Sequence, residues 1–135
     1  MMSFVRPTTQ IRVNQREQEL VNAKLGADVA ALDNILTDDY NYFELDKMQL
    51  LKEDELLIAE SKVVVFENIK IIDFRLWPLL GSTYRTSLLL EFYGVFAGKR
   101  FAKLRDLNHS WIEVNGILKL KFAYSTGIGI DIEQP

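Results

Sequence analysis

Apolar and polar residues alternate through residues 105–127, on both sides of the pair Asn115-Gly116. Alternation with a period of two is typical of strands, and Asn-Gly is a strong signal for a two-residue hairpin turn. Counting outward from this turn places His109 opposite Phe122 and Leu107 opposite Tyr124. One face of the predicted hairpin then collects Arg105, Leu107, His109, Trp111, Leu118, Leu120, Phe122 and Tyr124. The single histidine of the chain lies within this aromatic and aliphatic surface, which indicates a pocket.

The first half of the chain carries helical signals instead. Asn14 and Glu17 have the spacing of a capping box, so a helix begins there, or earlier at Thr9, and runs to Leu25 before Gly26. The remaining predicted elements are a short helix capped by Asp28, a strand at Tyr40–Glu44, a helix at 50–61, and strands at 63–76 and 85–96.

Helices with one strand, followed by four long strands, predict an α+β fold. We expect a cone-shaped, curved, antiparallel-rich sheet that wraps around the N-terminal helices and encloses a pocket. Leu88, Leu90 and Phe92 share the strand face that points into this cone. Because the chain has no repeat or linker, residues 1–135 are predicted to form a single domain, with residues 1–8 and 128–135 as flexible tails.

The amino-acid composition excludes several classes of function. Hydrophobic residues make up 48% of the 135 residues and charged residues 26%, which is typical of a globular chain that buries a core. The absence of cysteine excludes disulfides and thiol catalysis, and a single histidine excludes a multi-histidine metal site within one chain. We therefore expect neither a metal nor a cofactor.

Charge and hydropathy bear on partners. A net charge of −3 gives no cluster of basic residues for nucleic acid. No apolar run approaches the roughly 20 residues needed to span a bilayer. The N-terminal sequence MMSFVRPTTQ lacks the apolar core of a secretory signal. The prediction is a cytoplasmic protein with no nucleic-acid or membrane partner.

Three segments together resemble a known superfamily. They are GADVAALDNILTDDYNYFE, LKEDELL and HSWIEVNGILKLKFAYSTG, in this order and spacing. The pattern is similar to the nuclear transport factor 2-like superfamily, above all to its SnoaL-like polyketide cyclases and to the association domain of calcium/calmodulin-dependent kinase. The likeness covers residues 10–127. It implies a cone-shaped fold with a pocket, a homodimer, and either cofactor-free enzymes (isomerases, cyclases, dehydratases) or non-enzymatic binders.

The resemblance also suggests roles for two residues. Glu44 falls where the isomerase branch has its catalytic base, at the end of the first strand. His109 falls where the kinase association domain has an arginine that lines the pocket. The isomerase oxyanion-hole pair, a tyrosine with a protonated acid, has no match that we can place in this sequence.

Glu44 and His109 are the candidate catalytic residues. Glu44 shares a strand face with Tyr40 and Tyr42, and burial among these rings would raise its pKa toward the range of a general acid or base. The alternative is a solvated carboxylate at a strand end. His109 can shuttle protons near neutral pH, or it is a core histidine whose nitrogens are satisfied by neighbouring groups.

Five ligand-binding residues and one surface complete the hypothesis. The expected ligand-binding residues are Tyr40, Tyr42, Arg105, Trp111 and Tyr124, which suit an apolar, ring-containing small molecule. Arg105 either anchors an anionic group or is a surface residue in an ion pair. The outward strand faces carry an apolar patch, which favours a symmetric homodimer: Leu89, Tyr93, Val95, Ile112 and Val114.

Two functions remain open from the sequence. The first is a small-molecule-binding domain of unknown ligand, which as an enzyme would isomerise, cyclise or dehydrate its substrate by general acid–base chemistry. The alternative is a non-catalytic oligomerisation or protein-interaction module.

Overall fold

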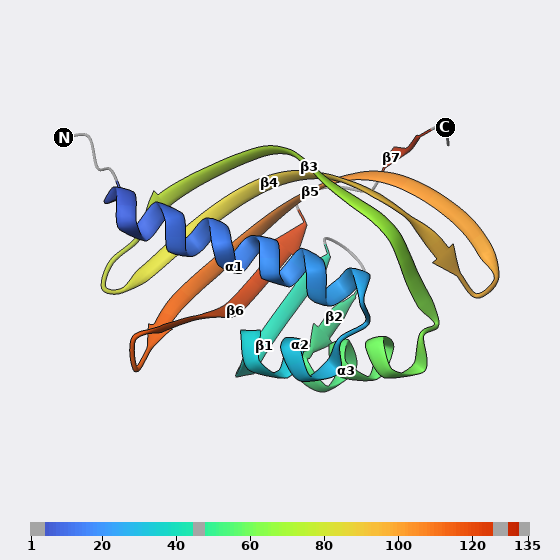
Figure 1. The fold of residues 1–135 in the computed structure, drawn as a ribbon, viewed down its shortest axis with the longest axis horizontal. Coiled ribbons are helices and arrows are strands. Elements are labelled where there is room, and N and C mark those ends of the chain that lie inside the picture. Colours follow the sequence, from blue (N-terminus) through green and yellow to red (C-terminus); the bar gives the residue numbers. More distant parts are fainter. Residues whose placement is uncertain (1–4, 45–47, 126–129, 133–135) are drawn as a thin grey trace.

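A computed structural model describes residues 5–44, 48–125 and 130–132 (Figure 1). The helices are α1 (Pro7–Leu25), α2 (Val29–Ile35) and α3 (Lys52–Ser61). The strands are β1 (Leu36–Glu44), β2 (Gln49–Leu51), β3 (Val64–Pro78), β4 (Thr83–Phe96), β5 (Lys99–Val114), β6 (Ile117–Ser125) and β7 (Ile130–Asp131).

The strands form one large curved sheet, and the helices lie on its concave side (Figure 1). The strand order is β2-β1-β6-β5-β4-β3, with β7 paired to β5. Neighbouring strands are antiparallel except β1 and β6, which are parallel. The sheet is not closed, because β2 and β3 are its two free ends. The predicted α+β fold with a curved, antiparallel-rich sheet is confirmed.

Local signals located most helix ends. Asp28 caps α2 by accepting a hydrogen bond from the Ala31 amide at 3.1 Å. The predicted helix at 50–61 is present as α3, where the Leu51 amide donates to Asp54 at 2.8 Å. A carboxylate at this position is favoured by the positive end of the helix dipole.

The predicted start of the first helix is wrong. α1 begins at Pro7, with the proline at the first helical position and no side-chain cap. A proline suits this position because the amide that it lacks has no partner in a helix anyway. The proposed capping pair, Asn14 and Glu17, lies within the helix instead, and Glu17 is buried. Residues 7–8 are therefore not part of a tail.

The predicted C-terminal tail, residues 128–135, lies only partly within the described residues. Residues 1–4, 126–129 and 133–135 lie outside the described residues. Ile130–Asp131 forms β7, which pairs with Lys103 and Leu104 of β5. The short strands β2 and β7 had no signal in the sequence.

A β-bulge changes the predicted face of β6. Trp111 pairs with Leu120, but Ser110 pairs with Phe122, so Lys121 is an extra residue in the ladder. Because side chains alternate with a period of two, one extra residue moves the rest of β6 to the opposite face. His109 therefore lies opposite Ala123 rather than Phe122.

The same bulge corrects two further predictions. Tyr124 lies opposite Asn108, not opposite Leu107. Phe122 and Tyr124 thus leave the face that holds Leu107 and His109. These two aromatic rings, which were expected inside the cone, lie on the outward side of the sheet.

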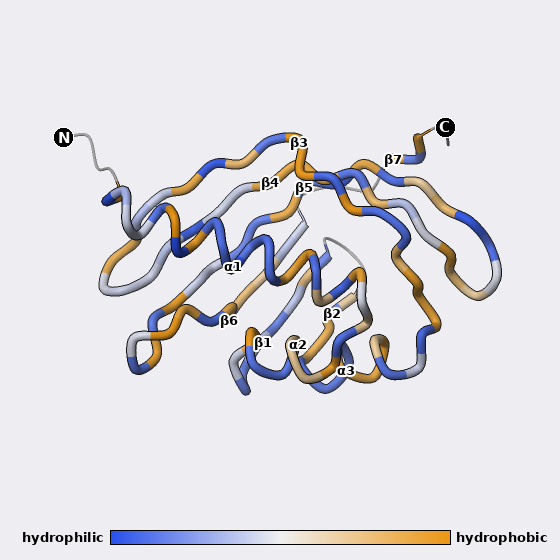
Figure 2. The backbone as a smooth tube through the Cα atoms, in the orientation of Figure 1, coloured by the Kyte–Doolittle hydropathy of each residue, from blue (hydrophilic) through white to orange (hydrophobic). Residues whose placement is uncertain are grey.

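Two hydrophobic clusters fill the space between the sheet and the helices. The first surrounds Trp111 and includes Val13, Leu20, Ile35, Leu36 and Leu120. The second contains Leu88, Leu90 and Phe92, which are buried as predicted, with Val21 and Leu107. Buried and half-buried residues alternate along β4, so one face of this strand contributes to these clusters. The long strands carry both hydrophobic and hydrophilic residues along their length (Figure 2).

Candidate functional site

The predicted site residues lie in three places. Glu44, Tyr42 and Arg105 meet at one end of the concave face. His109 and Trp111 lie in the core beneath α1. Tyr124 lies on the outward face. The structure joins Glu44 to Arg105 and joins His109 to Glu17, so it does not form the Glu44–His109 pair.

The core site is built around Glu17. Its carboxylate is 1% exposed and accepts three side-chain hydrogen bonds. Thr86 donates its hydroxyl at 2.5 Å, Trp111 its indole N–H at 2.8 Å, and His109 Nδ1 lies 2.9 Å from Oε1. The histidine is thus a core histidine with a satisfied nitrogen, although its partner is a carboxylate from another element. This cluster fastens α1 to β4 and β5.

Glu17 is charged because its partners outweigh its burial. Burial raises the pKa of the Glu17 carboxyl, but the imidazole of His109 and the three hydrogen bonds lower it by more. The resulting pKa lies below the ordinary glutamate value. A buried carboxylate that accepts several hydrogen bonds is stable only while all its donors remain in place.

Sequence reasoning missed Glu17, although the sequence held a signal. Glu17 lies four residues after Val13 and three before Leu20, which are both buried on the face of α1 that meets the sheet. A charged residue within the apolar stripe of a helix indicates a buried polar partner. The capping-box spacing with Asn14 obscured this signal.

The second site lies at the end of β1. Glu44 Oε1 accepts the hydroxyl of Tyr42 at 3.0 Å and also forms an ion pair with Arg105 of β5. Arg105 is therefore in an ion pair, although it is not the exposed surface residue of that alternative. The two side chains are only 14% and 23% exposed, so the pair lies largely within the concave face. Among the described residues, Nε of Arg105 is buried without a hydrogen-bond acceptor.

Two tyrosines of β1 keep their protons. Burial raises the pKa of Tyr42, and Glu44 raises it further, although Arg105 opposes this. Burial and Glu55 raise the pKa of Tyr40, whose hydroxyl donates to Glu55 at 2.7 Å. Both hydroxyls therefore act as hydrogen-bond donors at neutral pH.

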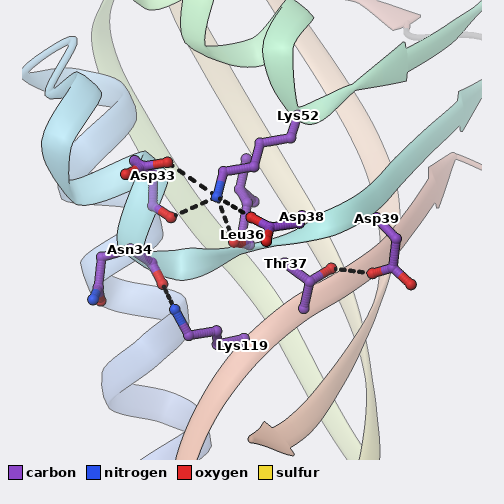
Figure 3. A network of polar contacts seen from close by, with 8 residues as sticks. All are labelled: Asp33, Asn34, Leu36, Thr37, Asp38, Asp39, Lys52 and Lys119. Atoms are coloured by element: carbon purple, nitrogen blue, oxygen red, sulfur yellow. Dashed lines mark hydrogen bonds and ion pairs between the residues drawn. The ribbon is translucent and has the colours of Figure 1, made fainter.

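A third polar network has a structural role (Figure 3). Lys52 Nζ lies 2.9 Å from the Asp33 carbonyl, 3.2 Å from the Leu36 carbonyl and 3.3 Å from Asp38 Oδ1. Burial lowers the pKa of Lys52, but Asp33 and Asp38 raise it by more, so the ammonium stays charged. The lysine thereby fastens the start of α3 to the end of α2 and the start of β1.

Two surface hollows are present, and the predicted ligand-binding residue Tyr40 lines the second of them. One, between α1 and α2, is lined by Arg16, Glu19, Asn22, Ala23, Asp28, Ala31, Asn34 and Ile35. The other is lined by Asp33, Asp38, Asp39, Tyr40, Asn41, Leu51, Lys52, Glu53 and Leu56. Neither contains Glu44 or His109, so a ligand pocket inside the cone stays a prediction. Within the described residues, no group of acidic or histidine side chains is arranged to hold a metal ion.

The outward face of the sheet carries aromatic rings around one arginine. We call Phe43, Trp77, Arg85, Val114, Ile117, Phe122 and Tyr124 the outer band. Phe122 packs 5.4 Å from Phe43 and 5.7 Å from Tyr124, measured between ring centroids. The Arg85 guanidinium lies 5.5 Å from the Trp77 ring and 6.0 Å from the Tyr124 ring.

Four residues of the outer band are exposed, and Arg85, Phe122 and Tyr124 are half-buried. The exposed fractions are 39% for Phe43, 42% for Trp77, 38% for Val114 and 48% for Ile117. Of the patch predicted from the sequence, Val114 belongs to this exposed set, while Leu89, Tyr93, Val95 and Ile112 are half-buried. The outer band differs from the predicted patch because the bulge in β6 places Phe122 and Tyr124 on this face.

Comparison with known proteins shows the fold. No protein-family model matches the sequence, and no curated protein matches it. Solved structures do match at low sequence identity. A nuclear transport factor 2-like (NTF2-like) protein from Cytophaga hutchinsonii has 18% identity and a TM-score of 0.81, covering 92% of this chain and 100% of that one.

Two association domains are similar as well. A putative calcium/calmodulin-dependent kinase II association domain from Exiguobacterium sibiricum has 11% identity and a TM-score of 0.82, over 97% of this chain and all of that one. The kinase association domain of C. elegans has 9% identity and a TM-score of 0.72, over 89% and 96% of the two chains. The chain therefore has the NTF2-like fold, as the sequence predicted. Within the described residues, no helix is long and apolar enough to cross a membrane.

Proposed function

We propose that this protein is an association domain that binds a second copy of itself through the outer band. The observation that carries the proposal is the exposed aromatic and aliphatic surface around Arg85. Aromatic residues and arginine are the side chains most enriched at the centres of protein interfaces. Exposed apolar side chains that gather on one face of a protein mark an interaction site.

The polar network beneath α1 also favours association over catalysis. The polar groups under α1 are engaged with one another, since Glu17 takes hydrogen bonds from Thr86, His109 and Trp111. A catalytic base needs a hydrogen-bonding position for its substrate, and this cluster uses its carboxylate within the core. The likeness to two proteins described as association domains supports the same reading.

Sedimentation velocity of the purified protein, over a wide range of concentrations, tests this function. We expect a concentration-dependent dimer that Ile117→Lys converts into a folded monomer, because the new ammonium would be desolvated in the interface. Leu57→Lys is the matched control, since Leu57 is 63% exposed on α3, away from the band. A wild-type protein that stays monomeric, or an Ile117→Lys variant that dimerises normally, would refute the proposal.

A second candidate function is the binding of a ring-containing small molecule at Tyr42, Glu44 and Arg105. Its support is the Arg105 guanidinium, which lies on the concave face with Nε buried and without an acceptor among the described residues. In an enzymatic version Glu44 would be the base, and Tyr42, a proton donor at neutral pH, would stabilise an oxyanion. His109 would contribute only if a ligand displaced it from Glu17.

Anilinonaphthalene sulfonate, an anionic aromatic dye, is a suitable probe for this second function. We expect its fluorescence to rise on binding the native protein, and the rise to be lost in Arg105→Met, because the sulfonate needs the guanidinium. Arg100→Met is the control, since Arg100 is an exposed residue of the same strand. Equal dye binding by all three proteins would exclude an anion site at Arg105. If a substrate is found, Glu44→Gln and His109→Ala test catalysis separately from binding, because loss of a catalytic residue should abolish turnover while the substrate still binds.

A further inference from the structure

Basic and apolar side chains gather around the β4–β5 turn, at the end of the sheet where β3 begins. We call these residues the hairpin-end patch: Lys62, Val63, Val65, Phe96, Lys99 and Arg100. Phe96 of β4 pairs with Val64 of β3 and with Lys99 of β5. The Ala97 amide in the turn donates to the Val63 carbonyl at 3.1 Å. Backbone pairing therefore brings together two basic segments that are distant in the sequence.

The apolar members of this patch are open to solvent. Phe96 is 55% exposed, Val65 43% and Val63 42%. Further along β4, Phe92 is buried in the core together with Val21 of α1. In Figure 1 the β4–β5 turn extends beyond the C-terminal end of α1. A cluster of exposed apolar side chains at such a turn indicates a contact with another molecule.

The charged members of the patch are positive, although the protein as a whole has a net charge of −3. Arg100 pairs with Glu67 at 2.5 Å, and its side chain is still 64% exposed. Lys62 and Lys99 are exposed and have no ion-pair partner within residues 5–44, 48–125 and 130–132. The excess of positive charge attracts a negatively charged surface.

The shape of the patch favours a lipid surface over a protein partner. A stable protein interface needs about 20–30 residues on each side, and the patch is a small group at a projecting turn. A lipid surface needs no matching shape, because its headgroups can move aside. Apolar side chains then enter the boundary between headgroups and acyl chains, while lysine and arginine remain at the level of the lipid phosphates.

We propose that the hairpin-end patch binds the surface of membranes that contain anionic lipids. Phe96, Val63 and Val65 enter the headgroup region, and Lys62 and Lys99 contact the anionic headgroups. The binding is reversible, since a few apolar side chains bury little area. The sequence pointed to no membrane partner because the two lysines become neighbours only in the folded protein. The inference does not rest on association, since the patch shares no residue with the outer band.

Co-sedimentation of the purified protein with lipid vesicles tests this inference. The vesicles contain phosphatidylcholine alone, or phosphatidylcholine with about one-third phosphatidylserine. We expect binding to the mixed vesicles only, and loss of this binding at about 0.5 M salt, because salt screens exposed charges. Lys99→Gln should weaken binding about fivefold, which is the contribution of one lysine near an anionic surface. Phe96→Ser should weaken it about tenfold, because the apolar contact is lost.

Lys121→Gln and Ile11→Ser are the matched controls. The Lys121 side chain is 50% exposed on β6, and Ile11 is 58% exposed on α1, which begins at the opposite end of the molecule from the β4–β5 turn (Figure 1). Neither change should alter binding. All four substituted residues are exposed, so the fold should be retained in each variant.

Three results would overturn the inference. The first is no binding to the mixed vesicles, or equal binding to phosphatidylcholine alone. The second is binding by Lys99→Gln that is as tight as that of the wild type. The third is wild-type binding by Phe96→Ser, which would mean that no side chain enters the lipid and that the patch attracts soluble polyanions instead. Sedimentation velocity without vesicles tests association separately, so the two proposals can fail independently.

Discussion

Replacing Glu17 by Gln is the most direct test of how the core is held together. The carboxylate of Glu17 accepts three buried donors, from Thr86, His109 and Trp111. A glutamine keeps the shape of the side chain but exchanges one acceptor oxygen for an amide that only donates. At least one buried donor then faces another donor, and neither has water to replace its partner.

The expected loss follows from these contacts. Each buried polar group left without a partner costs about 1–3 kcal/mol, and two such groups arise here. We therefore expect the free energy of unfolding to fall by about 3 kcal/mol. For a domain of this size, 1 kcal/mol corresponds to roughly 3–4 °C in Tm, so Tm should fall by about 10 °C.

Urea denaturation followed by tryptophan fluorescence measures this loss, since Trp111 itself reports on the cluster. Glu19→Gln is the matched control, because Glu19 lies on the same helix but is 53% exposed and pairs with the surface residue Arg16 rather than with buried donors. The control should change stability by no more than about 0.5 kcal/mol. If Glu17→Gln unfolds within about 1 kcal/mol of the wild type, Glu17 does not carry the network that the structure assigns to it.

Three further predictions concern pH, the Lys52 network and the backbone of β4. The pKa of Glu17 is lower in the folded protein than the ordinary glutamate value. The stability that the charged Glu17 contributes is therefore complete above the ordinary pKa and is lost as the pH falls through the folded pKa. Measuring Tm as a function of acid pH should show this loss in the wild type and a smaller loss in Glu17→Gln. Lys52→Met should cost about 1–3 kcal/mol in urea denaturation, because the carbonyl of Leu36 and the carboxylate of Asp38 lose their donor, whereas Lys99→Met should be neutral. Gly94→Ala should lower Tm by several degrees, since the new Cβ would lie 2.4 Å from the Val65 carbonyl oxygen. Gly26→Ala is the control, because its Cβ would have its nearest contact at 3.4 Å. Equal Tm values for the two variants would contradict the close approach of β3 and β4.

Local sequence signals determined the elements of this protein. Asp28 caps α2 because its short side chain reaches the Ala31 amide whatever the rest of the chain does. The pair Asn115-Gly116 forms the β5–β6 turn with positive φ angles of 51° and 79°, which these residue types tolerate. Leu88, Leu90 and Phe92 are buried because alternation places them on one face of β4. The order of these elements was enough to predict the fold.

The candidate sites depended on contacts that no local pattern contains. The bulge at Lys121 changed the face of Phe122 and Tyr124, because a single extra residue reverses alternation and leaves no mark in the sequence. Glu17 meets His109 across 92 residues of sequence, and Glu44 meets Arg105 across 61. Which charge neutralises which is decided by how α1 and β1 are placed on the sheet, and that placement is set by the packing of the whole core. The sequence by itself therefore determined the three helices, the five longer strands and their order. Only the tertiary structure decided where the short strands β2 and β7 form, which polar residues are partners and which face of the sheet is left for another molecule.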